Sequence, residues 1–187
     1  MQSLTEAFRA AFQLVVELDP NLLEIIWLSL GVSGTSLLLA SLIGLPMGAS
    51  LAVFRFPGRR SLIVVVNALM GLPPVVVGLV VYLVLSRSGP LGGLGWLFTP
   101  KAMVVAQCLL ITPIVAALSR QVAEDLWEEY EDQLRSLGAT AASSIPTLLW
   151  DGRFRLVTTV LAGFGRAIGE VGAVIVTSAK ERVFCAG

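Results

Sequence analysis

The feature that most constrains this chain is the absence of charge from long apolar stretches. No charged residue occurs between Glu24 and Arg55. A helix that crosses the hydrocarbon core of a bilayer needs about 20 predominantly apolar residues, so residues 25–54 are long enough to span a membrane. The whole chain has 56% hydrophobic and 14% charged residues, whereas a typical soluble domain has about 25% charged residues. The sequence therefore predicts a membrane protein.

Three further stretches have the length and apolar character of a membrane span: residues 61–85, 102–119 and 156–179. Lipid offers no partner to unpaired backbone groups, so spanning segments fold as helices or as closed β-barrels. The alternation typical of barrel strands is absent from runs such as residues 75–77. We therefore predict an all-α, polytopic membrane fold with about four transmembrane helices, in one domain that covers residues 1–187.

Basic residues in the loops predict the orientation. Residues 55–60 contain three arginines and no acidic residue, and residues 120–155 contain four arginines. The loop 86–101 has one arginine and one lysine, and the N-terminal segment has only Arg9. Because Lys and Arg are enriched in cytoplasmic loops, loops 55–60 and 120–155 are predicted to face the cytoplasm and the N-terminus to lie outside. The predicted location is the plasma (inner) membrane.

Composition argues against several classes of protein. The formal net charge is zero, which argues against nucleic acid as a partner. The chain has no histidine, which weakens zinc, haem and histidine-based acid–base proposals. It has no G-x-x-x-x-G-K-[ST] motif, so it is not expected to bind ATP through a P-loop. We predict no catalytic residue, no metal and no cofactor in this chain, and Cys108 and Cys185 are too few for a disulfide framework.

Gly71, Pro73 and Pro74 punctuate the second apolar stretch. Proline lacks the backbone N–H and kinks or breaks a helix. One interpretation is ordinary packing of transmembrane helices. The other is a helix broken beside a transport pathway, because irregular backbone at membrane depth is tolerated where it lines a cavity.

Arg166 and Glu170 are the charged residues within the fourth apolar stretch, and their spacing of four places them on one helix face. Charges within a span usually face the protein interior or a water-filled cavity. They are interpreted either as an ion pair that fixes helix packing or as groups lining an anion path. In the second case Arg166 would attract the cargo or Glu170 would set a gate.

The segment between the third and fourth stretches has two parts. Residues 124–132 are strongly acidic, which ordinarily indicates a solvated face. Residues 134–150 then offer an apolar face interrupted by Gly138 and Pro146: Leu137, Ala141, Ile145, Leu148 and Leu149. Short amphipathic helices of this kind dock into grooves on partner proteins. We predict that this face binds a cytoplasmic partner.

Four segments together resemble the permease subunits of ABC importers, in particular the tungstate permease group, which is related to the molybdate and sulfate permeases. They are residues 71–78 (GLPPVVVG), 85–92 (LSRSGPLG), 98–107 (FTPKAMVVAQ) and 162–174 (AGFGRAIGEVGAV). The resemblance covers roughly residues 22–175. It implies the fold of type I importer permeases and the import of an oxyanion, with tungstate first and molybdate or sulfate as alternatives.

The family's cytoplasmic signature is E-A-A, three residues, G, nine residues, then I-x-L-P. Gly138 matches the glycine, Leu148 stands at the isoleucine position, and Trp150 and Asp151 stand where Leu-Pro would be. The resemblance implies an ATPase-coupling role for eight residues: Asp132, Gln133, Leu134, Arg135, Ser136, Leu137, Gly138 and Ala139. Gly71, Pro73, Pro74, Arg166 and Glu170 remain, from the residue patterns above, the candidates for a translocation path.

The resemblance also implies partners: a second permease copy in a homodimer, a cytoplasmic ATPase subunit that holds the ATP, and an extracytoplasmic oxyanion-binding protein, all at a lipid bilayer. Two other classes stay open, a channel or secondary transporter that needs no ATPase, and an inactive subunit. Family members continue past the GAV segment into a Gly-Gly-Asn stretch and a further span. Here residues 177–187 (TSAKERVFCAG) follow instead, which predicts a truncated or frameshifted end.

Overall fold

The computed structural model describes residues 20–184, and side chains within residues 23–169. The described part of the chain is helical and contains no strand: α2 (Pro20–Val53), α3 (Arg59–Met70), α4 (Pro74–Leu85), the 3₁₀ turn η1 (Gly92–Leu94), α5 (Pro100–Ser136), α6 (Ala141–Asp151) and α7 (Arg153–Phe184). The predicted all-α fold is confirmed. Residues 1–19, Cys185 and the last two residues lie outside the described part.

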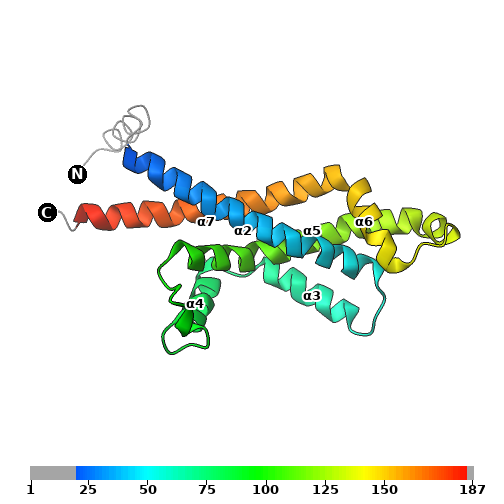
Figure 1. Ribbon diagram of the computed structural model, residues 1–187, viewed down its shortest axis with the longest axis horizontal. Coiled ribbons are helices and arrows are strands. Elements are labelled where there is room, and N and C mark those ends of the chain that lie inside the picture. The colour runs from blue at the N-terminus through cyan, green and yellow to red at the C-terminus, as the bar shows by residue number, and fades with distance from the viewer. Residues whose placement is uncertain (1–19, 185–187) are drawn as a thin grey trace.

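Helices α2 and α5 pack along most of their length and run in the same direction, and α7 returns beside them (Figure 1). Glycine permits the close approach: a Cβ at Gly44 would lie 3.0 Å from Val115, and one at Gly48 would overlap the carbonyl oxygen of Ala116. The Ser119 hydroxyl donates to the Leu45 carbonyl across the same interface, at 3.0 Å. Small residues and cross-helix hydrogen bonds are the usual means of packing helices in lipid.

The second predicted span is not one straight helix. Helices α3 and α4 meet at a bend of 101° across residues 71–73. Pro73 is extended, with φ −64° and ψ 135°, and Pro74 opens α4. Neither proline can donate a backbone hydrogen bond, and a residue that precedes a proline is disfavoured in the α region, so the helix of residues 61–85 breaks here. Helix α4 then turns away from the bundle (Figure 1).

The third predicted span is much longer than residues 102–119. Helix α5 continues without interruption to Ser136. Residues 120–136 contain no glycine or proline and are rich in strong helix formers, so nothing in their sequence ends the helix. The acidic half of the predicted loop 120–155 is therefore a helical extension of a membrane span.

Two of the described helices, α2 and α5, are long and apolar enough to cross a membrane, and the bent pair α3–α4 would make a third span. The fourth predicted span, residues 156–179, falls within α7. Its second half, with Glu170, lies beyond the described side chains. The loop 54–58 and helix α6 lie at the same end of the molecule (Figure 1), as loops on one side of a membrane must.

Candidate coupling surface and translocation path

Gly138 ends α5 in a backbone conformation that suits glycine. Its φ is +80°, in the left-handed region. The Gly138 amide donates to the Arg135 carbonyl at 3.0 Å, and the Ala139 amide donates to the Leu134 carbonyl at 2.9 Å. These two bonds form a Schellman motif, which satisfies the last carbonyls of a helix. The glycine of the family signature thus sets the direction in which the chain leaves α5.

Thr140 starts α6 two residues later. The Thr140 hydroxyl accepts from the Ser143 amide at 3.3 Å, and the Ser143 hydroxyl accepts from the Thr140 amide at 2.9 Å. This reciprocal capping box stabilises the first turn of a helix. The turn between α5 and α6, residues 137–140, is therefore fixed on both sides by backbone geometry.

The apolar face of α6 packs inward on the chain's own helices, and the predicted contact of this segment with a partner stays a prediction. Leu148 is 1% exposed and joins a core of Ala49, Ala52 and Val53 from α2 with Ala123, Leu126 and Trp127 from α5. Ala141, Ile145 and Leu149 pack against the same core. A short helix buries its apolar stripe against the nearest apolar surface. Here that surface is the chain's own α2–α5 pair.

The predicted coupling residues differ in how far they are exposed on the surface of the chain. Leu134 and Ala139 are half-buried. Leu137 is 83% exposed at the tip of the turn. The other five predicted residues are exposed as well: Asp132, Gln133, Arg135, Ser136 and Gly138. A partner would thus meet the turn and the last turn of α5 rather than the apolar stripe of α6.

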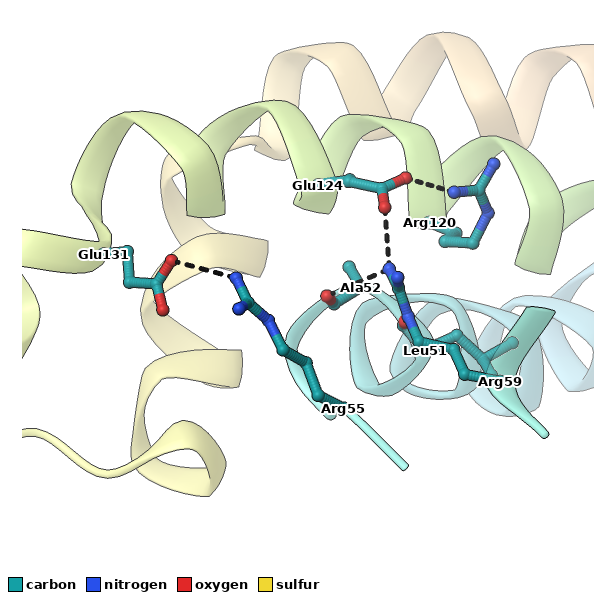
Figure 2. A network of polar contacts seen from close by, with 7 residues as sticks. All are labelled: Leu51, Ala52, Arg55, Arg59, Arg120, Glu124 and Glu131. Atoms are coloured by element: carbon teal, nitrogen blue, oxygen red, sulfur yellow. Dashed lines mark hydrogen bonds and ion pairs between the residues drawn. The ribbon is translucent and has the colours of Figure 1, made fainter. Parts of the chain in front are cut away.

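Arg59 joins three parts of the molecule (Figure 2). Its guanidinium donates to the Leu51 and Ala52 carbonyls near the end of α2, at 2.7 and 3.3 Å, and to the Glu124 carboxylate at 2.6 Å. Glu124 also pairs with Arg120, one turn back on α5. A cation near a helix C-terminus satisfies its orphan carbonyls. Glu124 therefore ties α5 to the end of α2 and the start of α3.

A second carboxylate links the same elements. Glu131 pairs with Arg135 on its own helix at 2.5 Å and with Arg55 of the loop after α2 at 3.6 Å. Asp125 pairs with Arg155 of α7 at 3.6 Å. The acidic run 124–132 is thus not only a solvated face. It cross-links α5 to the neighbouring elements, and sequence reasoning missed these pairs.

Tyr130 of α5 packs against the core that holds α6. The neighbouring Glu129 carboxylate raises the pKa of the Tyr130 hydroxyl above its ordinary value of 10.0, and the Asp151 carboxylate at the end of α6 raises it further. Tyr130 is consequently neutral near pH 7.

The structure brings Arg166 to the helix break. Its guanidinium donates to the Leu72 carbonyl at 3.5 Å, between Gly71 and Pro73. A broken helix leaves carbonyl groups without helical partners, and an arginine of a neighbouring helix can satisfy one of them. Arg166, Gly71, Pro73 and Pro74 therefore form one local cluster. Glu170 lies outside the described side chains, so its predicted pairing with Arg166 stays a prediction.

A cavity of about 570 Å³ lies beside the break, between α2, α3, α4 and α5. Its lining is almost wholly apolar and includes Met47, Leu69, Leu72, Val76, Leu109 and Pro113. Desolvating a dianion in such a space would be costly. The cavity does not fit an oxyanion, and Arg166 is the residue that brings a positive charge to the break.

No group of three or more acidic or cysteine side chains in the described part of the chain is arranged to hold a metal ion. The polar groups that the structure brings together are instead arginine side chains that lie near carbonyl or carboxylate oxygens. Together with the membrane-length helices and the broken helix pair, they define a polytopic α-helical membrane protein. One end of it carries a charged platform, made by the ion-paired residues Arg55, Arg59, Arg120, Glu124, Asp125, Glu131, Arg135 and Arg155.

Comparison with known proteins assigns the family. Residues 41–175 match the binding-protein-dependent transport system inner membrane component. The chain belongs to this family of ABC transporter permeases.

Three relatives illustrate its range. The chain is 38% identical to a tungstate uptake system permease protein of Peptoclostridium acidaminophilum, over 94% of this chain and 77% of that protein. It is 38% identical to a probable anion ABC transporter permease protein of Haloferax volcanii, over 83% and 67%. A sulfate transport system permease protein of Escherichia coli is 29% identical, and the match spans 59% of its length.

Proposed function

We propose that this chain is the membrane subunit of an ATP-driven importer of an oxyanion, and that the oxyanion is tungstate. The observation that carries this proposal is the 38% identity to a tungstate permease over nearly the whole chain. A second tungstate permease, from Campylobacter jejuni, is 33% identical over 91% of the chain. Sulfate permeases are more distant, which makes sulfate or molybdate, also dianionic oxyanions, the second candidate cargo.

The turn at residues 137–140 is the proposed contact with a cytoplasmic ATPase. Its support is geometric: the turn is exposed at its tip, yet it is braced from behind by the core around Leu148. A displacement of the turn is expected to move the packed ends of α2 and α5 together, because close-packed interiors transmit displacement. The proposed orientation places this end of the molecule in the cytoplasm of the cell, at the inner membrane.

Transport is proposed to follow alternating access. ATP binding and hydrolysis on the partner ATPases would move the turn between two positions, and a second copy of the permease would complete the pathway. An extracytoplasmic binding protein would deliver the oxyanion, as the family's description suggests. The two states must differ in their contacts. The Arg166–Leu72 hydrogen bond is one contact that can differ between them.

The test is the variant Gly138→Asp in the full chain, expressed with its ATPase and binding protein. We expect tungstate uptake by proteoliposomes to fall at least about ten-fold, because a side chain with φ +80° distorts the turn and adds a negative charge where the partner docks. ATP hydrolysis should become independent of tungstate, while the permease remains in the membrane.

Gly95→Asp is the matched control. Gly95 also has a left-handed φ, of +62°, and open space around it, but it lies in the loop between α4 and α5. It carries a similar backbone strain away from the proposed contact, so uptake should be preserved. Normal uptake by Gly138→Asp would contradict the coupling role. Failure of any ATPase to copurify with the unmodified chain would favour a channel or secondary transporter instead.

A further inference from the structure

A groove between α7 and its neighbours takes no part in the coupling turn or the helix break. It has a volume of about 340 Å³ and an almost wholly apolar lining. Leu45 of α2 and Leu149 of α6 form part of its wall, and α7 contributes Leu156, Val157, Val160 and Leu161, with Arg153 at the end where α7 begins. Val157 and Leu161 are more than half exposed, so the groove opens on the outer face of the molecule.

The groove begins where the predicted membrane span of α7 begins and extends along that span. Arg153 is the first residue of α7, and the apolar stretch predicted to span the membrane starts at Leu156. Leu161 lies eight residues beyond Arg153, which corresponds to about 12 Å along a helix. A ligand of this groove would therefore have a polar end at the boundary and an apolar body among lipid chains. A soluble partner cannot reach that depth.

Arg153 is held in place by its neighbours. Its guanidinium donates to the Trp150 carbonyl at 2.9 Å and lies 5.2 Å from the Trp150 ring centre and 4.6 Å from that of Phe154. Trp150 and Phe154 are 72% and 74% exposed. Exposed aromatic side chains at this depth are typical of a membrane–water interface, although tryptophan and tyrosine are the preferred residues there. The aromatic rings fix the direction of the charge at the mouth of the groove.

The charge of Arg153 is not neutralised by a carboxylate of the described part of the chain. Among the described side chains, no carboxylate forms an ion pair with Arg153, whereas the next arginine of α7, Arg155, pairs with Asp125. A guanidinium presents a planar fork of donors that matches a phosphate group, and aromatic stacking leaves that fork available. The site thus combines one oriented phosphate donor with an apolar channel that descends from it.

We propose that this groove binds an anionic phospholipid, with the lipid phosphate on Arg153 and an acyl chain along α7 toward Leu161. Charge complementarity selects the ligand class, because cationic pockets between transmembrane helices bind acidic head groups. The bound lipid contacts α2, α6 and α7 at once and stabilises the junction between the platform and the membrane.

The experiment is native mass spectrometry of the purified full chain titrated with dioleoyl phosphatidylglycerol, and separately with dioleoyl phosphatidylcholine. We expect one tightly retained phosphatidylglycerol per chain and weaker retention of phosphatidylcholine. Arg153→Gln should weaken phosphatidylglycerol binding about five-fold, the size expected for one basic residue at a membrane surface. Arg155→Gln, the same charge change two residues away, should have a smaller effect.

A second variant tests the groove itself. Val157→Trp fills the channel and keeps the charge, and it should displace phosphatidylglycerol while leaving the chain folded, since Val157 is 55% exposed. Glycerophosphoglycerol, the head group without acyl chains, should not compete. Equal losses for Arg153→Gln and Arg155→Gln would overturn the proposal in favour of general surface charge. Loss of dimer with unchanged lipid retention in Val157→Trp would assign the groove to a second copy instead.

Discussion

Glu124 is a residue whose role depends on its surroundings rather than on its sequence neighbours. Its carboxylate accepts from arginines on two different helices, Arg59 and Arg120 (Figure 2). Its side chain is 31% exposed, and those of Arg59 and Arg120 are more buried still. Solvent screening is thus only partial here. The arginines would be left close together and without this carboxylate if Glu124 were neutralised.

We predict that Glu124→Gln lowers the free energy of unfolding by about 1–2 kcal/mol, because hydrogen bonds to charged groups contribute about 1.5–3 kcal/mol and partial exposure reduces that value. Thermal unfolding in detergent measures the change. Asp125→Asn is the control, since Asp125 is 70% exposed and its ion pair is long, at 3.6 Å. A loss no larger than that of the control would mean that the two arginines are stabilised by other groups.

The sequence indicates only part of this residue-scale chemistry. The spacing of Arg120 and Glu124 by four residues identifies a pair on one helix face. Arg59 lies 65 residues from Glu124, and no periodicity relates them, because their approach depends on how α2 and α5 pack. Gly138 was singled out from the sequence by its match to the glycine of the family signature, and the structure adds that it ends α5 with a left-handed φ.

Among the elements, α6 illustrates what an apolar pattern leaves open. Its apolar stripe was recognisable from the sequence, but a stripe does not say whether the surface it covers belongs to the same chain or to a partner. Leu148 is 1% exposed within the protein, whereas Leu137, on the preceding turn, is 83% exposed. Leu148 therefore belongs to the folded core, whereas Leu137 belongs to the surface of the proposed contact.

Leu148→Ala should cost about 2–4 kcal/mol of stability, because it leaves a cavity in the core. Leu137→Ala should change stability by less than about 0.5 kcal/mol, as is usual for exposed positions, yet weaken copurification of the ATPase. Thermal unfolding and pull-down from detergent extracts measure the two effects. Unchanged copurification with Leu137→Ala would remove the tip of the turn from the proposed contact.

The break between α3 and α4 and the length of α5 also separate what the local sequence encodes from what packing determines. Two consecutive prolines predict a break from covalent geometry alone. The 101° bend, however, depends on what α3 and α4 pack against and is not encoded locally. The extension of α5 to Ser136 was missed because a run of charges was taken as the end of a helix. Such a run marks only where a helix leaves the hydrocarbon core of the membrane.

At the scale of the whole molecule, Arg166 connects α7 to the break, and the cluster lies far along α7 from the charged platform. The apolar stretches and the loop charges are enough to predict the membrane fold, because both follow from the cost of burying charge in lipid. They do not predict this contact, which joins residues 94 positions apart.

We predict that Arg166→Gln reduces oxyanion uptake by proteoliposomes at least about ten-fold, since it removes a charged donor worth more than about 1.4 kcal/mol. Copurification of the ATPase should be unchanged. Arg166→Lys, which keeps the charge, should recover part of the uptake, and Arg87→Gln in the loop after α4 is the control. Normal uptake by Arg166→Gln would exclude this residue from the translocation path.

The uninterrupted length of α5 has a mechanical consequence. Its 37 residues correspond to about 55 Å, against a hydrocarbon thickness of about 30 Å. If α5 tilts as one rod about its centre by about 5°, each tip swings by about 2.4 Å, and the two tips swing in opposite senses. Such a tilt would narrow the proposed pathway at one end of α5 and widen it at the other end at the same time.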